Sequence, residues 1–86
     1  MIEFRFYPSS ISTSRETIEH FVVQANDYHS SIMIQLDNKT VNAKSILGLL
    51  SLGKTPDSAL MIIDGEDEVA AFNDLKNFVA HQTEIK

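Results

Sequence analysis

The 86-residue chain contains no cysteine, three glycines, two prolines and no long run of apolar residues. Without cysteine, neither a disulfide framework nor a thiolate zinc site can hold the fold together. The low glycine and proline content, with 43% hydrophobic and 22% charged residues, is typical of a globular fold. No apolar run approaches the ~20 residues that cross a bilayer, and residues 1–7 do not resemble a signal peptide. We therefore expect a cytoplasmic protein without a membrane span.

The sequence also lacks a block of basic residues, since twelve acidic residues outnumber seven basic ones and the net charge is -5. Direct nucleic-acid binding is not expected from such a chain. Its three histidines, His20, His29 and His81, do not have the spacing of a shared metal site. Glycine-rich phosphate loops and activated nucleophiles are absent from the sequence as well. We expect neither enzymatic activity nor a metal or cofactor.

Alternation of apolar and polar residues predicts two strands, over residues 2–6 and 32–36. A β-prone run resumes at Thr40 and Val41 after Asp37 and Asn38, which are suited to a tight turn, so a hairpin is expected there. The compact apolar run over residues 60–63 follows turn residues 55–57 and predicts a strand at the centre of its sheet.

A first helix is predicted from Ile18 to Tyr28, because its apolar residues follow i, i+3 and i+4 spacing. The cluster of hydroxyl residues at 12–14 can cap its start, and Thr13 has capping-box spacing to Glu16. A short second helix is expected to open at Ser45 and to close on Gly53.

A third helix is predicted behind the acidic residues 66–68, which favour a helix N-terminus first and form a partner surface second. Its expected apolar stripe is Val69, Phe72, Leu75, Phe78 and Val79. The resulting element order, β-α-β-β-α-β-α, shows no internal repeat or linker. We therefore predict one α+β domain over residues 1–86, with three helices on one face of a small sheet.

Taken with this element order, the segment Val41–Leu52 resembles the HPr family of phosphocarrier proteins, and within it the catabolite-repression paralogue. Support comes from Phe21, Val22, Ala25, Asn26, Tyr28 and residues 64–68. The resemblance implies an open-faced β-sandwich in which three helices cover one face of a four-stranded antiparallel sheet.

Only the first loop departs from the family pattern, which has a glycine, a catalytic histidine, an arginine and a proline there. The corresponding residues are Ser12, Ser14, Glu16 and Thr17. A serine hydroxyl, whose pKa is far above neutral, cannot accept and pass on a phosphoryl group as an imidazole can. Glu16 also replaces a guanidinium that would complement phosphate. No catalytic residue is predicted, and phosphocarrier activity is not expected.

Ser45 corresponds to the family's regulatory serine. The resemblance implies phosphorylation by HPr kinase/phosphorylase and, in that form, binding to a LacI-type catabolite control repressor or a metabolic enzyme. A phosphate on a helix-capping serine meets exposed backbone amides, so the segment can accommodate it. The predicted partner-binding residues are Ile46, Leu47, Leu50, Lys44 and Arg15.

Simpler readings compete with these predictions. Ser45 can be an ordinary helix cap, and Leu47 and Leu50 can be core side chains. His20 shares a helix face with Glu16 and Gln24, which favours a solvated polar residue over a displaced phosphoacceptor. The leading hypothesis is a regulatory protein of carbon catabolite control. The alternatives are a residual phosphocarrier of the sugar phosphotransferase system and an unphosphorylated scaffold protein.

Overall fold

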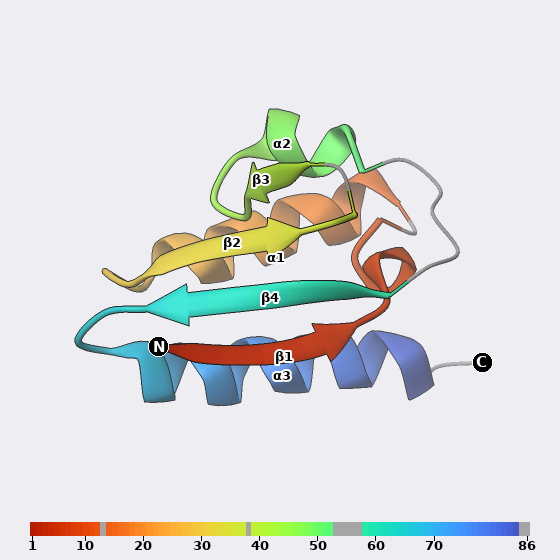
Figure 1. Ribbon diagram of the computed structural model, residues 1–86. Helices are drawn as coiled ribbons and strands as arrows, with labels where there is room; N and C mark the ends of the chain where they lie inside the picture. The colour runs from red at the N-terminus through yellow and green to blue at the C-terminus, as the bar shows by residue number, and fades with distance from the viewer. Residues whose placement is uncertain (13, 38, 53–57, 85–86) are drawn as a thin grey trace.

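The computed structural model describes residues 1–12, 14–37, 39–52 and 58–84, with residues 81–84 described for the backbone alone. A four-stranded sheet forms one layer, and α1 and α3 pass behind it as a second layer, with α2 beside β3 (Figure 1). The elements are β1 (Ile2–Phe6), the 3-10 helix η1 (Pro8–Ser10), α1 (Arg15–Asn26), β2 (Ser31–Gln35), β3 (Thr40–Asn42), α2 (Ile46–Leu50), β4 (Ala59–Asp64) and α3 (Glu68–Glu84).

The sheet has the order β1-β4-β2-β3, and every neighbouring pair is antiparallel. Ile62 of β4 pairs with Glu3 on one side and with Met33 on the other. The predicted central position of β4 and the predicted hairpin between β2 and β3 are both confirmed. The four-stranded antiparallel sheet with three helices confirms the predicted α+β class. No helix in the described ranges combines the length and the hydropathy of a membrane span.

The core lies between the sheet and the two long helices. Alternate residues of the strands point into it, including the fully buried Ile34 and Met61. Phe21 of α1 is also fully buried and meets Phe78 of α3 edge to face, with 5.3 Å between ring centroids. Each large apolar side chain buried here contributes roughly 1.5–3 kcal/mol, which is how a chain without disulfides is held together.

Three expectations about the helices need correction. The chain forms the 3-10 helix η1 after β1, where only a strand end was predicted. Val69 is 62% exposed, and Ala71 is the buried residue of the first turn of α3. Because a helix rotates about 100° per residue, Val69 lies about 120° from the direction of Leu75 and leaves the apolar stripe. Tyr28 lies beyond the end of α1 and is half-buried.

The cap of α1 also differs from the predicted capping box. Ser14 is the N-cap, and its Oγ accepts a hydrogen bond from the Thr17 N–H at 3.1 Å. Glu16 is then the second residue of the helix, one position too early for the reciprocal bond of a capping box. Thr13 itself lies outside the described residues, as do Asn38, Gly53 and the turn residues 55–57.

Candidate functional site

Ser45 is the N-cap of α2, as the sequence predicted. Its backbone is extended, with φ -112° and ψ 122°, and its Oγ accepts a hydrogen bond from the Gly48 N–H at 3.1 Å. Its own N–H donates to the Asn42 carbonyl at 3.1 Å, which fixes the cap against the end of β3. The hydroxyl therefore stands at the first turn of α2, beside the backbone N–H groups that a helix start leaves unpaired.

Gly48 allows α2 to sit this close to β3. A Cβ at position 48 would lie 3.1 Å from the Asn42 carbonyl oxygen, closer than ordinary van der Waals contact. Since the contacted atom belongs to the backbone, it cannot turn aside as a side chain would. The glycine thus lets the cap and the strand end approach each other.

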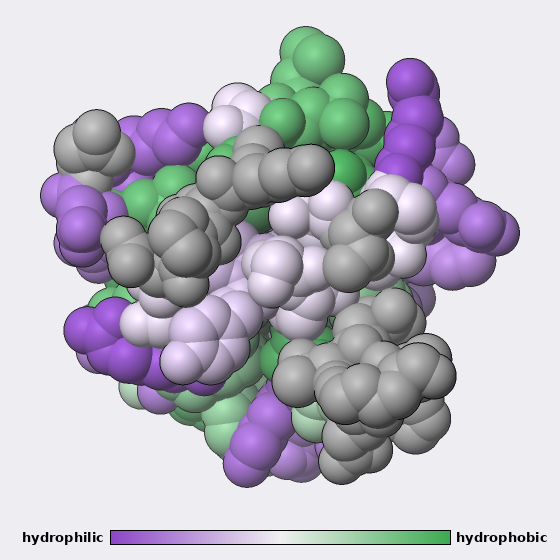
Figure 2. All heavy atoms as spheres, turned by 90° about the vertical axis from the view of Figure 1, so that its right-hand side faces the viewer, coloured by the Kyte–Doolittle hydropathy of each residue, from purple (hydrophilic) through white to green (hydrophobic). Residues whose placement is uncertain are grey.

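Three apolar side chains of α2 face solvent next to Ser45. Leu47 is 79% exposed, Leu50 41% and Ile46 36%, whereas Leu49 is fully buried and anchors the helix. The reading of Leu47 and Leu50 as core residues is therefore wrong. Figure 2 shows hydrophobic side chains projecting at the top of the molecule, the level at which α2 lies in Figure 1. We call Ile46, Leu47 and Leu50 the α2 patch.

An exposed apolar residue that sequence reasoning missed is Val23, which is 64% exposed on α1. Its neighbours Phe21 and Val22 are buried, whereas Val23 lies on the solvent side of the helix. The helix periodicity carries this signal, because Val23 lies about 200° from Phe21 around the helix.

Lys44 is a structural anchor in the free protein. Its Nζ donates a hydrogen bond of 2.6 Å to the Tyr28 carbonyl, just beyond the C-terminal end of α1. In return, Asn26 Nδ2 donates to the Lys44 carbonyl at 3.2 Å. A cation at a helix C-terminus is favoured by the carbonyl groups left unpaired there. The predicted partner-binding ammonium is thus engaged in holding the start of α2 to the end of α1.

Arg15 lies far from Ser45. It is the first residue of α1, and its Nε donates to Glu19 Oε2 at 3.2 Å on the helix surface. Lys44, which precedes Ser45, instead contacts Asn26, eleven residues later along α1 and therefore roughly 16 Å away along the helix axis. The structure brings Lys44 and the α2 patch to Ser45, but it does not bring Arg15 there.

The position of the family's histidine, Ser14, is an exposed helix cap. Its Oγ also shares a hydrogen bond with Thr17 Oγ1 at 3.0 Å. His20 lies in the middle of α1 and is exposed, about 9 Å along the helix axis from Ser14. The side chain of His81 lies outside the described residues, and no group of three metal-ligating side chains occurs among the described ones. Among the described side chains, no imidazole therefore lies at the first turn of α1.

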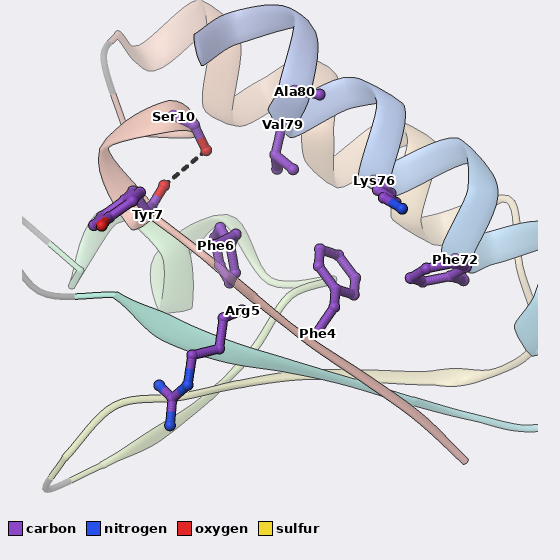
Figure 3. A pocket seen from close by; sticks show the side chains of 9 residues that line it. All are labelled: Phe4, Arg5, Phe6, Tyr7, Ser10, Phe72, Lys76, Val79 and Ala80. Carbon is purple, nitrogen blue, oxygen red and sulfur yellow. Dashed lines mark hydrogen bonds between the residues drawn. The ribbon is translucent and has the colours of Figure 1, made fainter.

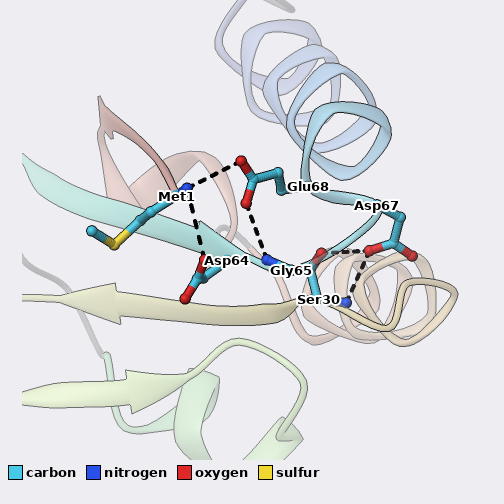
Figure 4. A network of polar contacts seen from close by, with 6 residues as sticks. All are labelled: Met1, Ser30, Asp64, Gly65, Asp67 and Glu68. Atoms are coloured by element: carbon cyan, nitrogen blue, oxygen red, sulfur yellow. Dashed lines mark hydrogen bonds and ion pairs between the residues drawn. The ribbon is translucent and has the colours of Figure 1, made fainter.

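Asp67, immediately before α3, binds the neighbouring loop, a contact that the sequence analysis did not predict. Asp67 accepts a hydrogen bond from the His29 N–H at 2.8 Å. It also accepts from the Ser30 N–H at 2.9 Å and from the Ser30 hydroxyl (Figure 4). These bonds, that of the Ser30 hydroxyl above all, lower the pKa of Asp67 from 3.8 to about 2. Asp67 therefore joins the loop between α1 and β2 to the start of α3.

Gly65 and Glu68 complete this corner. Glu68 Oε1 accepts from the Gly65 N–H at 3.1 Å, and Oε2 lies 3.1 Å from the ammonium of Met1, which is also 3.7 Å from Asp64. The bond from Gly65 is the main cause that lowers the pKa of Glu68. Gly65 has φ +156°, and a Cβ there would lie 2.6 Å from Ser30 Oγ, so a side chain is excluded.

Comparison with known proteins shows that most of the chain matches a known family. The family model described as "PTS HPr component phosphorylation site" matches residues 16–81. The HPr-like protein Crh of Bacillus subtilis (strain 168) is 41% identical over 63 residues, which cover 72% of this chain and 74% of that protein. The family match begins after Ser12 and Ser14 and includes Ser45 and the α2 patch.

Solved structures of HPr and of Crh are similar to this chain in fold. A crystal structure of HPr-C-His from Thermoanaerobacter tengcongensis has a TM-score of 0.82 and 27% identity, covering 100% of this chain and 99% of that one. The crystal structure of Bacillus subtilis Crh, described as a catabolite repression protein, has a TM-score of 0.67 and 39% identity over 76% of either chain.

Proposed function

The chain belongs to the HPr family, and from this premise we propose that it is a regulatory member that carries no phosphate on a histidine. In this proposal, HPr kinase/phosphorylase phosphorylates Ser45, and the modified α2 surface binds a partner protein. The partner is a LacI-type catabolite control repressor or a metabolic enzyme, and the process is carbon catabolite regulation. The similarity to Crh, described as a catabolite repression protein, supports this choice of process.

The observation that carries the proposal is the position of Ser45 beside the α2 patch. Leu47, two residues from the hydroxyl, exposes 79% of its surface although it is a leucine. An exposed apolar group next to a site of charge change suits a surface whose binding is switched by modification. Leu49 anchors the short helix in the core, so the patch is presented on a fixed element.

Phosphorylation would act at Ser45 without unfolding α2. The phosphate would stand at the start of the helix, where backbone N–H groups can donate to its oxygens. It would add about -1.5 to -2 charges to a chain whose net charge is -5. Because Lys44 Nζ is bound to the Tyr28 carbonyl, the new charge remains available to basic side chains of a partner.

The absence of an imidazole at Ser14 argues against a phosphocarrier role. A histidine carrier needs a group that is nucleophilic near neutral pH, and an alkyl hydroxyl bound to Thr17 is not such a group. His20 lies on a different part of α1 and lacks the helix-start amides that would hold a phosphoryl group. The chain thus keeps the fold of the family, whereas Ser14 and His20 do not support phosphoryl transfer through a histidine.

The first experiment is phosphorylation with HPr kinase/phosphorylase and ATP, followed by measurement of intact mass. We expect one phosphate on the wild-type protein and none on Ser45→Ala. Ser14→Ala is the matched control, because it also removes a helix-capping serine, a change that costs about 1 kcal/mol in either helix. It should be phosphorylated like the wild type.

Binding of the phosphorylated protein to a LacI-type repressor then tests the second half of the proposal. Leu47→Ser should be phosphorylated normally and should weaken the binding by tenfold or more, if the patch is a buried anchor worth about 1.4 kcal/mol or more. Failure of the wild type to accept phosphate, while genuine HPr is phosphorylated in parallel, would leave the scaffold alternative. Acid-labile labelling by phosphoenolpyruvate and enzyme I would instead establish a phosphocarrier.

A further inference from the structure

A cavity of about 380 Å³ lies between β1 and α3, at the edge of the sheet opposite to β3 and α2 (Figure 3). Its volume falls within the range of about 300–1,000 Å³ that is usual for small-ligand sites. Neither Ser45 nor the α2 patch lines it. It is therefore separate from the surface assigned to regulation.

The walls of the cavity are mainly apolar, and three phenylalanines contribute to them. Phe4 and Phe6 point from β1 toward α3, and Phe72 faces them from the helix (Figure 3). The rings of Phe4 and Phe72 meet edge to face, with centroids 5.3 Å apart. Val79 closes the opposite end of the helix side. These surfaces favour a ligand with an apolar, ring-sized body.

The charged group on the helix side of the cavity is Lys76. Its Nζ lies 5.2 Å from the centroid of the Phe72 ring. The residues three and four positions away along α3 are Phe72, Asn73, Val79 and Ala80, so no acidic side chain stands where it could pair with Lys76 within the helix. Among the described residues, no ion pair to Lys76 is found. The ammonium can therefore accept an external anion.

The rest of the cavity lining is also free of negative charge, which suits the binding of an anion. None of the nine lining residues is acidic, in a chain with twelve acidic residues against seven basic ones. Arg5 contributes to the lining, but its guanidinium points away and donates to Ser58 Oγ at 3.4 Å. Ser10 Oγ donates to the Tyr7 carbonyl at 2.7 Å. Lys76 is thus the cation that faces this cavity.

We propose that the cavity binds a small carboxylate with an aromatic body, whose ring lies among Phe4, Phe6 and Phe72 and whose carboxylate pairs with Lys76. A ring with a short chain matches a site with apolar walls and a cation at its rim. The carboxylate would form a hydrogen-bonded ion pair with the Lys76 ammonium, which neither a neutral nor a cationic analogue can form.

Phenylbutyrate is the probe, and backbone amide shifts of isotope-labelled protein are the readout. We expect saturable shifts confined to β1, η1 and α3, with α2 unmoved. Phenylbutanol and phenylbutylamine carry the same ring without the negative charge. They should bind at least about fivefold more weakly, since the ion pair with Lys76 is lost. Equal binding of the three compounds would overturn the role of Lys76.

Two variants with matched controls locate the site. Lys76→Gln keeps most of the side-chain stem and should weaken phenylbutyrate binding, whereas Lys39→Gln removes a lysine from the β2–β3 hairpin and should not. Ala80→Phe should fill the cavity and abolish binding of phenylbutyrate. Ala70→Phe places the same ring at an exposed position of α3 that does not line the cavity, and it should bind phenylbutyrate like the wild type.

The proposal would be overturned if no saturable shift occurred up to about 10 mM phenylbutyrate, tenfold above a millimolar Kd. It would also be overturned if Ala80→Phe bound like the wild type. If an aromatic peptide shifted the whole of β1 while phenylbutyrate did not, the edge strand would be a peptide-docking site instead.

Discussion

Two serines occupy the same kind of position in this protein and are expected to differ in function. Ser14 and Ser45 each cap a helix, and each Oγ accepts a backbone N–H at 3.1 Å. Local geometry alone therefore does not distinguish them. Their surroundings do, because Ser45 is followed by the exposed Leu47, whereas Ser14 is bound to Thr17 and precedes an Arg15–Glu19 pair. The assignment of regulation to Ser45 depends on this difference and on family membership.

The Asp67 carboxylate is expected to make the protein acid-sensitive. Its folded pKa, about 2, lies below the ordinary 3.8, so its bonds to His29 and Ser30 stabilise the fold above pH 3.8. This stabilisation is lost as the pH falls toward the folded value, because the unfolded state takes up the proton more readily. Asp67→Asn should lower the Tm at neutral pH and should show a smaller further loss below pH 3.8 than the wild type.

Thermal unfolding at neutral and acid pH measures this effect. Asp27→Asn is the control, since Asp27 is an exposed aspartate at the end of α1. It should keep the acid-dependent loss of the wild type. An identical acid-dependent loss in Asp67→Asn and in the wild type would contradict the role assigned to Asp67.

At the scale of one element, α2 carries one leucine that anchors it in the core, Leu49, and one that is proposed to bind a partner, Leu47. Leu49→Ala should lower the free energy of unfolding by about 2–5 kcal/mol, because it leaves a cavity in the core. Leu47→Ser should change it by no more than about 0.5 kcal/mol, because the side chain already lies in solvent. Denaturant unfolding measures both. A large loss in Leu47→Ser would show that this leucine packs in the core.

The elements themselves were largely predictable from the sequence. Hydrophobic periodicity located the three helices and the four strands, and the apolar run of β4 indicated its central place. The cap of α1 was misassigned because residues 12–14 all carry hydroxyls, and their sequence does not show which one has the extended backbone. Val69 was wrongly assigned to the apolar stripe of α3 because it is apolar, although its position about 120° around the helix from Leu75 exposes it.

The site was less predictable than the fold, for a physical reason. The cap at Ser45 depends on neighbours within three residues and could be predicted. The bonds from Lys44 to Tyr28 and from Ser30 to Asp67 join residues 16 and 37 positions apart. The cavity between β1 and α3 joins segments still further apart. Such contacts require the packed fold, and a single sequence does not contain their geometry.

For the molecule as a whole, the two proposed binding surfaces lie at opposite edges of one sheet. The α2 patch lies next to β3, and the cavity lies next to β1, with β4 and β2 between them. Between these surfaces, α1 packs against α2 on one side and is joined to α3 on the other by a polar contact at Asp74. Tyr28 donates to its Oδ2 at 2.7 Å, and Gln24 Nε2 donates to its Oδ1 at 2.8 Å.

This contact predicts alkaline behaviour of the whole fold. The hydrogen bond to Asp74 is the main cause that raises the pKa of Tyr28 from 10.0 to about 12. Because the folded value is the higher one, the stabilisation is present below pH 10 and is lost as the pH rises toward 12. Tyr28→Phe should lower the Tm at neutral pH and remove the phenolate absorbance that develops near pH 12 in the folded protein. Tyr7→Phe, at the other tyrosine, should leave that late step in place. If Tyr28→Phe retained it, the bond to Asp74 would not join α1 and α3 in solution.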